Sequence, residues 1–236
     1  MKIAAQFVIS AAAAKDFPRD GLPEVAMVGR SNVGKSTLIN ALTRQRLART
    51  SAEPGKTRLA NVYRVARGSA APVYLVDLPG YGYARRSKVD NEPSFEALTE
   101  AFFAREQASA ILLVDTRHPG LVNDRAAWQW LQAAAPAAIV GTKIDKLTRS
   151  QRISALRQLE SAFEHTVLPV SAVTGEGLDE LWTLIDRLAN SQPPQLPPSS
   201  PSRPPSPMEP LPPRRPTASA KALASPPKRG EQRRRR

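Results

Sequence analysis

The feature that most constrains this chain is a glycine-bounded loop at residues 29–36, directly after a short apolar run at residues 25–28. The loop has the sequence Gly-Arg-Ser-Asn-Val-Gly-Lys-Ser, which fits the pattern G-x-x-x-x-G-K-[ST]. Its glycines let successive backbone N–H groups turn inward, and the helix-like pattern that follows adds a positive dipole end. A strand, this loop and a helix in that order predict a phosphate-binding loop, with a simple glycine turn as the alternative.

The first 190 residues alternate between short apolar runs and helix-like stretches. The predicted strands are Val25–Val28, Val73–Val76, Ala110–Val114, Ala138–Val140 and Thr166–Val170, with an additional antiparallel strand at Asn61–Ala66. The predicted helices are Ser36–Leu42, Phe95–Arg105, Asp124–Ala134, Ser150–Phe163 and Leu178–Leu188. Continuous apolar strands that alternate with helices are typical of a sheet covered on both faces. We therefore expect an α/β fold of the P-loop NTPase class. Its sheet should be doubly wound, mostly parallel and six-stranded, with one antiparallel edge strand and helices on both faces.

Composition divides the chain into three predicted parts. Residues 191–236 hold 14 of the 23 prolines and a net charge of +8 out of +13, with few large apolar side chains. Such a segment cannot offset its ordering entropy with a core, so we expect a disordered, proline-rich basic tail. Residues 1–22 are expected to be a lead-in segment, and residues 23–190 the globular domain. The arginine run at the end of the tail favours polyanion binding, or else simply solubilises the protein.

Several other classes of protein are disfavoured. The chain has no cysteine, which excludes disulfides and cysteine-based zinc sites, and its two histidines are too far apart in sequence to suggest a metal site. No apolar run reaches the roughly 18 residues of a membrane span. A weak signal peptide at the N-terminus is the alternative to an edge strand there. We expect a cytoplasmic protein without membrane contact.

A second motif, D-x-x-G, ends the apolar run at residues 73–76. Asp77 lies where a strand of such a sheet presents its carboxyl end, and it can hold a water bound to Mg²⁺. The Gly80 N–H can face the γ-phosphate of a bound nucleotide. Lys35 would reach the β- and γ-phosphates and the Ser36 hydroxyl would ligate Mg²⁺. Thr57, in the stretch Pro-Gly-Lys-Thr-Arg, is the natural second hydroxyl ligand. The alternatives are an ordinary strand-end turn and a solvated turn.

The stretch Thr-Lys-Ile-Asp at residues 142–145 predicts which base is bound. A carboxylate at Asp145 can accept two hydrogen bonds from the guanine N1–H and exocyclic amine, whereas adenine lacks this donor pair. The stem of Lys143 can pack along the base. Ser171 and Ala172, at the end of the fifth run, can present a backbone N–H to the guanine carbonyl. The sequence therefore predicts GTP rather than ATP.

Taken together, these stretches resemble the EngB/YihA family of ribosome-biogenesis GTP-binding proteins, within the TrmE-Era-EngA-EngB-Septin-like GTPase superfamily. The resemblance covers roughly residues 7–189 and makes residues 23–190 an EngB-type G domain. Its characteristic stretches are GRSNVGKSTLINALT, LARTSAEPGKTR, VDLPGYGYA, DTRHPG and TKIDKL. Thr142 stands where most GTPases have Asn, and this departure is typical of the family.

The resemblance implies a set of residues in contact with GTP or GDP. They are Gly29, Arg30, Ser31, Asn32, Val33, Gly34, Lys35, Ser36, Gly55, Lys56, Thr57, Arg58, Leu59, Asp77, Leu78, Pro79, Gly80, Thr142, Lys143, Ile144, Asp145, Ser171, Ala172 and Val173. Lys35, Thr57 and Gly80 would serve catalysis, and Ser36 and Thr57 would hold Mg²⁺. The resemblance also implies a role in assembly of the large ribosomal subunit, with the subunit or its rRNA as partner, and a requirement for cell division and septation. We expect a monomer.

One residue points to slow intrinsic hydrolysis. Many GTPases have a Gln directly after D-x-x-G to orient the attacking water, but this chain has Tyr81. A partner or an ion could supply the missing group. Asn32 is at the loop position that holds K⁺ in some related GTPases, so K⁺ activation is a hypothesis.

Other readings of the chain remain open. Asp115 and His118, in DTRHPG, could form an acid–base pair, but a strand-end Asp before a turn is favoured. A metabolite kinase and a binding protein of the division apparatus without significant catalysis are the alternative functions.

Overall fold

The structure, a computed structural model, describes residues 2–48, 59–81 and 95–191. The strands in this part of the chain are β1 (Ile3–Ala11), β2 (Glu24–Gly29), β3 (Ala60–Arg67), β4 (Val73–Asp77), β5 (Ala108–Asp115), β6 (Ala137–Thr142) and β7 (Val167–Pro169). The α-helices are α1 (Lys35–Thr43), α2 (Phe95–Phe103), α3 (Val122–Ala134), α4 (Arg149–Phe163) and α5 (Leu178–Ala189). Two short 3₁₀ helices, η1 (Ala14–Asp16) and η2 (Ile144–Lys146), complete the elements.

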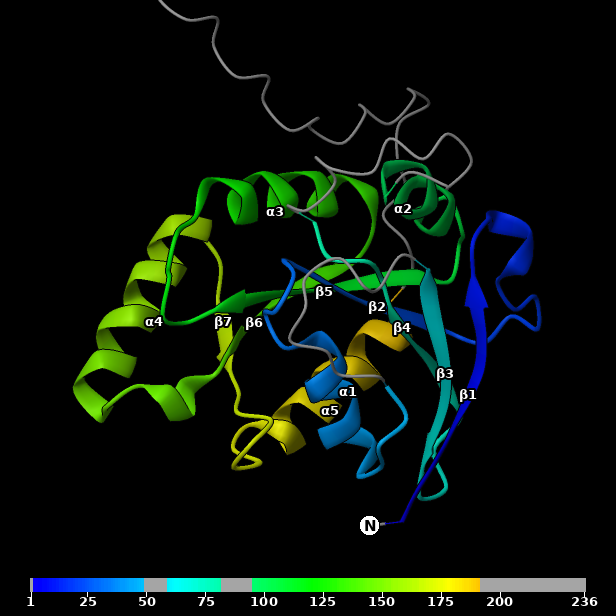
Figure 1. Cartoon of the computed structure of the whole chain (residues 1–236), viewed down its shortest axis with the longest axis horizontal. Coiled ribbons are helices and arrows are strands. Elements are labelled where there is room, and N and C mark those ends of the chain that lie inside the picture. The colour runs from blue at the N-terminus through cyan, green and yellow to red at the C-terminus, as the bar shows by residue number, and fades with distance from the viewer. Residues whose placement is uncertain (1, 49–58, 82–94, 192–236) are drawn as a thin grey trace, which may run out of the picture.

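All seven strands belong to one sheet, in the order β1-β3-β4-β2-β5-β6-β7 (Figure 1). β4, β2, β5, β6 and β7 pair in parallel, whereas β3 is antiparallel to both of its neighbours. The predicted α/β P-loop fold, with a mostly parallel sheet, is confirmed.

The prediction of six strands with an antiparallel strand at the edge was wrong in two details. The described sheet has a seventh strand, β1, which pairs with β3 from Ile3 opposite Arg67 to Ala11 opposite Ala60 and confirms the edge strand expected at the N-terminus. The antiparallel strand β3 is therefore second from the edge. The pairing register shifts between Phe7 and Ile9, as in a β-bulge, which interrupts the alternation that marks a half-buried strand in a sequence.

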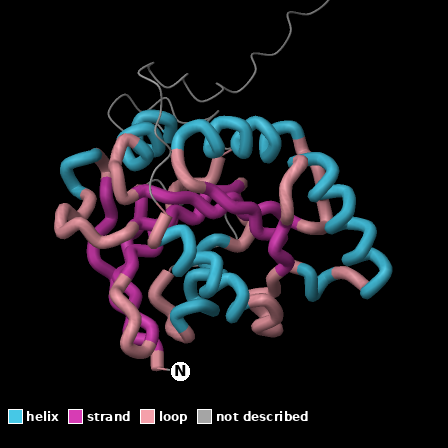
Figure 2. Tube along the Cα trace, turned by 180° about the vertical axis from the view of Figure 1, so that it is seen from behind, coloured by secondary structure: helices cyan, strands magenta, loops and turns pink. Residues whose placement is uncertain are grey.

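The central strands are mostly apolar because both of their faces are covered. Every residue of β2, β4 and β5 is buried. Helices α1 and α5 cover one face, where Leu38 and Trp182 belong to one cluster of buried side chains. Helices α2, α3 and α4 cover the other face (Figures 1 and 2). This two-sided covering matches the continuous apolar runs in the sequence.

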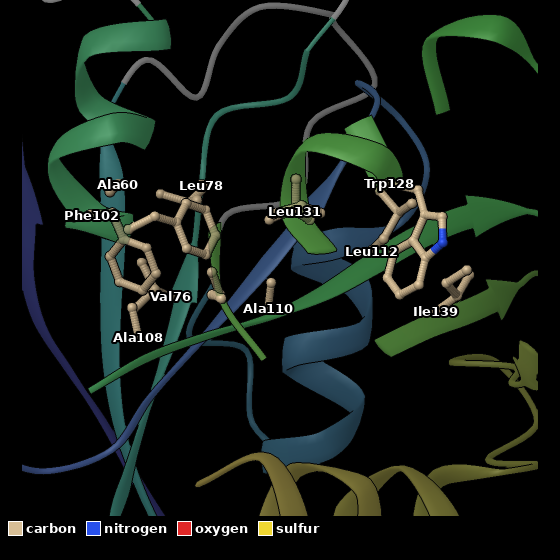
Figure 3. Close-up of a cluster of buried hydrophobic side chains, with 14 of the residues drawn as sticks. Ala60, Val76, Leu78, Phe102, Ala108, Ala110, Leu112, Trp128, Leu131 and Ile139 are labelled. Carbon is tan, nitrogen blue, oxygen red and sulfur yellow. The ribbon is translucent and has the colours of Figure 1, made fainter. Parts of the chain in front are cut away.

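The second face is shown close up in Figure 3, where side chains of α2 and α3 pack onto the strands. Phe102 of α2 lies near Val76 and Ala108, and Trp128 and Leu131 of α3 lie over Leu112 and Ile139. Burial of one such large side chain contributes about 1.5–3 kcal/mol to folding. This packing fixes α3 on this face of the sheet.

The remaining predictions concern membrane spans, domain boundaries and the tail. Within residues 2–48, 59–81 and 95–191, no helix combines the length and apolar character needed to span a membrane. The domain boundaries stay predictions. The tail from residue 192 onward lies outside the described residues.

Candidate nucleotide-binding site

The phosphate-loop motif occupies the turn between β2 and α1, as predicted. Gly29 is the last residue of β2 and Lys35 is the first of α1. Gly34 caps the helix with a φ of 112°, a left-handed conformation that a residue with a side chain adopts only under strain. The amides at the start of α1 have no partner within the helix, so this turn is suited to bind an anion.

Lys35 folds back over its own loop. Its Nζ donates to the backbone carbonyls of Gly29 (3.1 Å) and Arg30 (3.3 Å), and the residue is only 8% exposed. Burial lowers the pKa of Lys35, and the nearby charge of Asp77 opposes that shift. A cation held in this way lies beside the loop amides, where phosphate oxygens would compensate its burial.

Ser36 and Asp77 meet at the carboxyl end of β4. The Ser36 hydroxyl donates to Asp77 Oδ2 at 2.7 Å, while Asp77 Oδ1 is buried and has no hydrogen-bond partner among the described residues. Burial raises the pKa of Asp77, against the effects of Lys35 and Ser36. Mg²⁺ prefers oxygen ligands and keeps several of its bound waters. The Ser36 hydroxyl can be such a ligand, and the unpaired Asp77 oxygen can accept a hydrogen bond from a bound water. The residues present therefore fit the predicted magnesium site.

The D-x-x-G segment lies directly against the phosphate loop. A Cβ at Gly80 would come within 2.7 Å of the Ser31 backbone nitrogen and 2.9 Å of its Cα, so only glycine allows this approach. Leu78 is fully buried, and Pro79 connects it to Gly80. The predicted γ-phosphate sensor thus contacts the loop that would hold the phosphates.

Tyr81, which stands in place of the common Gln, is engaged elsewhere. Its hydroxyl donates to Asp124 Oδ1 at 2.8 Å, and Arg30 Nε lies 3.2 Å from the same oxygen. Burial and the neighbouring Asp124 raise the pKa of Tyr81, so its hydroxyl stays protonated and acts as donor. Arg30 and Tyr81 also form a parallel backbone bridge. The three residues tie the phosphate loop, the segment after Gly80 and α3 together.

The predicted base-recognition stretch begins at the end of β6 and is tied to the phosphate loop by two contacts. Thr142 Oγ1 lies 2.9 Å from the Val33 carbonyl and can donate to it. Lys143 adopts a φ of 63°, and its Nζ donates to the Asn32 carbonyl at 2.6 Å. Thr142, at the position where Asn is common, thus joins the base loop to the phosphate loop with a hydroxyl.

Asp145 and Ser171 form the far end of the site. Ser171 Oγ donates to Asp145 Oδ1 at 2.8 Å and accepts hydrogen bonds from the backbone N–H groups of Val173 and Thr174. Burial alone would raise the pKa of Asp145, but the hydrogen bond from Ser171 is among the contacts that hold it below its ordinary value. Asp145 is therefore ionised at neutral pH and can accept from guanine. Ile144 is buried beneath the loop, Ala172 is half-buried, and Val173 is 74% exposed.

Most of the predicted residues therefore gather at one edge of the sheet, at the carboxyl ends of β2, β4, β6 and β7. Leu59 lies just before β3, whereas Gly55, Lys56, Thr57 and Arg58 lie outside the described residues. Sequence reasoning missed Asp124, which resembles an ordinary acidic residue in the first turn of a helix. It also assigned no role in the site to Asp115, although its place at the end of β5 was a usable signal.

The sheet order, the phosphate loop, the D-x-x-G segment and the Thr-Lys-x-Asp stretch together define a P-loop GTPase. The family described as "50S ribosome-binding GTPase" matches residues 24–143. The chain is 41% identical over 190 residues to a probable GTP-binding protein EngB from Oceanobacillus iheyensis, covering 78% of this chain and 95% of the relative. It is 42% identical over 199 residues to the EngB protein of Heliobacterium modesticaldum, covering 81% and 95%. The chain belongs to the EngB family of GTP-binding proteins.

A solved structure supports the same class. An Era variant from Aquifex aeolicus bound to GDP·AlF4⁻ superimposes with a TM-score of 0.62 at 25% sequence identity. The match covers 74% of this chain and 59% of the Era chain. The likeness therefore concerns the GTPase domain, and the rest of the Era chain has no counterpart in the match.

Proposed function

We propose that the chain binds GTP with Mg²⁺ at this edge of the sheet and hydrolyses it as a switch in assembly of the large ribosomal subunit. The observation that carries the nucleotide part is the 2.6 Å hydrogen bond from Lys143 Nζ to the Asn32 carbonyl. It joins the predicted base loop to the phosphate loop, so one ligand with a base and phosphates would contact both. The family description "50S ribosome-binding GTPase" supports the ribosomal part.

Each residue would have a separate task in this proposal. Lys35 and the loop amides would stabilise charge on the phosphates, and Gly80 would sense the γ-phosphate through its N–H. Ser36 and Thr57 would hold Mg²⁺, which neutralises phosphate charge when bound. Asp145 would select guanine. Chemistry of this kind depends on positioning and electrostatics, and it needs no covalent intermediate.

The isolated protein is expected to hydrolyse GTP slowly. The Tyr81 hydroxyl is bonded to Asp124, and a phenol is in any case a poor substitute for the Gln that orients water. An activating partner, or K⁺ held near Asn32, would then supply the missing stabilisation. Comparison of turnover in K⁺ and Na⁺ buffers separates these two sources.

The assignment of the base site predicts a change of ligand for Asp145→Asn. An amide donates where the carboxylate accepted, so guanine loses its donor-to-acceptor pairing whereas xanthine, with a carbonyl at C2, gains one. We expect GDP affinity to fall by at least about 100-fold and xanthosine diphosphate affinity to rise. Titration calorimetry measures both, with Asp179→Asn, an exposed acid of α5, as the matched control. Adenine nucleotides that compete equally with GDP on the unmodified protein would refute the base assignment.

The ribosomal role predicts nucleotide-dependent sedimentation. GTP would order the segments around Thr57 and Gly80, and hydrolysis would release them, so only one state should present the ribosome-binding surface. We expect more protein to sediment with large-subunit particles in a non-hydrolysable GTP analogue than in GDP. Equal sedimentation in both nucleotides would contradict the switch. The family-implied role in division, the monomeric state and the cytoplasmic location stay predictions. A division protein that uses its GDP or GTP state without significant catalysis is the alternative.

A further inference from the structure

The stretch Asp-Thr-Arg-His-Pro-Gly after β5 is not explained by the proposed function. Its first residue, Asp115, is the last residue of β5, and its side chain is only 5% exposed. His118 contacts it through the backbone, since the His118 N–H donates to the Asp115 carbonyl. The carboxylate contacts other groups, and those groups point to the nucleotide site rather than to acid–base chemistry.

Asp115 is held between two cations. Oδ2 accepts from Lys143 Nζ at 3.0 Å and from Arg117 Nη2 at 2.7 Å, and Oδ1 accepts from the Nε and the backbone N–H of Arg117. Burial alone would raise the pKa of Asp115, but the hydrogen bonds from Arg117 and Lys143 lower it well below its ordinary value. The group is therefore a permanent anion at neutral pH and a fixed partner for the Lys143 ammonium.

Lys143 is thereby fixed at both of its ends. Its backbone is in the left-handed region with a φ of 63°, and its Nζ bonds both to Asp115 and to the Asn32 carbonyl of the phosphate loop. The stem passes the loop closely, because a Cβ at Gly34 would lie 3.9 Å from Lys143 Cε. A lysine side chain normally has many rotamers, and ordering it only when a ligand binds would cost affinity.

We propose that Asp115 is a positioning residue for guanine-nucleotide binding: its buried carboxylate orders the Lys143 side chain before the ligand arrives. In this arrangement the methylene stem of Lys143 forms a preformed wall for the purine, and the ammonium couples the base loop to the phosphate loop. The inference rests on the base site assigned under Proposed function, and it adds a residue that acts only through Lys143.

A double-mutant cycle tests this dependence. GDP affinity is measured by titration calorimetry, with Mg²⁺, for the full chain and for Asp115→Ala, Lys143→Met and the double variant. We expect Lys143→Met to weaken GDP binding by at least about tenfold and Asp115→Ala by about tenfold. In the Lys143→Met background, the further loss from Asp115→Ala should be less than about twofold, because the group that Asp115 orders is already gone.

Two further variants keep the test specific. Arg117→Met removes the other cation from Asp115 but leaves Lys143, and it should change GDP affinity less than about threefold. Asp115→Asn keeps an acceptor for Lys143, so its GDP affinity should lie between those of the parent and of Asp115→Ala. If the alanine variant does not fold, Asp115→Asn replaces it in the double-mutant cycle. Circular dichroism establishes folding of each variant.

The outcomes separate the two hypotheses. If Lys143→Met leaves GDP affinity unchanged, the positioning inference fails, whereas the base assignment rests on Asp145 and fails if Asp145→Asn leaves GDP affinity unchanged. If Lys143→Met weakens binding but Asp115→Ala does not, or if Asp115→Ala weakens it equally in both backgrounds, only the positioning role is overturned. A loss confined to the background that retains Lys143 supports it.

Discussion

The Lys35→Met variant should lose at least about 100-fold in GTP affinity and all measurable GTP hydrolysis. The Lys35 side chain folds back over the phosphate loop, where its ammonium donates to the carbonyls of Gly29 and Arg30. The backbone of this turn offers phosphate oxygens only neutral N–H donors. The loss of a buried ammonium that faces them therefore removes a large charge contribution to binding that comes from the protein itself.

The same substitution should have a much smaller effect on the stability of the nucleotide-free fold. Burial lowers the pKa of Lys35, which means that the folded protein disfavours its charge. An apolar side chain of similar length removes this burden but leaves the carbonyls of Gly29 and Arg30 without a donor, so we expect the two effects to offset and the free energy of unfolding to stay within about 1 kcal/mol of the parent. The variant would thus fail to bind although its fold is intact.

Thermal unfolding with and without GDP measures both effects together. A ligand at 1,000 times its Kd stabilises the folded state by about 4 kcal/mol, so the parent protein should unfold at a clearly higher temperature with GDP. The Lys35→Met variant should show no such rise, while the matched control Lys15→Met, at an exposed position in η1, should behave as the parent does. A Lys35→Met variant that bound GTP within about threefold of the parent would rule out the phosphate site.

The phosphate loop and the helix that follows it were predictable because their sequence signals are local. The first helix was predicted at Ser36–Leu42 and begins and ends one residue further out, at Lys35 and Thr43. A glycine that must adopt positive φ, followed by a lysine at a helix start, is a constraint within eight residues. Such a pattern needs no knowledge of the rest of the chain.

The N-terminal strand was harder to predict because its partner is remote. β1 pairs with β3, and its first residue, Ile3, is opposite Arg67, so no hairpin turn connects the two. The register shift near Phe7 removes the regular alternation, and the exposed Phe7 and Val8 contradict a simple inside–outside pattern. The sequence therefore favours an edge strand at this end of the chain but does not assign it to the sheet, and the predicted sheet has one strand too few.

Contacts of charged residues were the least predictable part of the site. Arg30 is remote in sequence from Asp115 and Asp124, and each of the three has an ordinary local explanation as a loop residue, a strand end or a helix start. Only the packing of α3 over the strand ends shows that Asp124 contacts the phosphate loop. Sequence patterns identify which residue types could do chemistry, whereas tertiary structure decides which of them meet.

The largest effect on folding is expected for Asp124→Ala. Asp124 is 1% exposed, and one of its oxygens serves both the Tyr81 hydroxyl and the Arg30 guanidinium. Alanine would leave the buried Tyr81 hydroxyl without its acceptor and the Arg30 guanidinium without its ion-pair partner. We expect the free energy of unfolding to fall by about 2–4 kcal/mol and the midpoint of thermal unfolding by roughly 5–15 °C.

The comparison with Tyr81→Phe separates the contribution of the Tyr81 hydroxyl to stability from that of the Asp124–Arg30 ion pair. Phenylalanine removes only the hydroxyl and leaves Asp124 paired with Arg30, so a loss of about 1 kcal/mol is expected. Asp179→Ala is the matched control, because it removes an exposed acid from the first turn of α5. Denaturant unfolding measures the free energy of unfolding of the three variants and ranks them by it. If Asp124→Ala were no more destabilising than Asp179→Ala, the contacts of Asp124 with Tyr81 and Arg30 would not hold α3 to the phosphate loop.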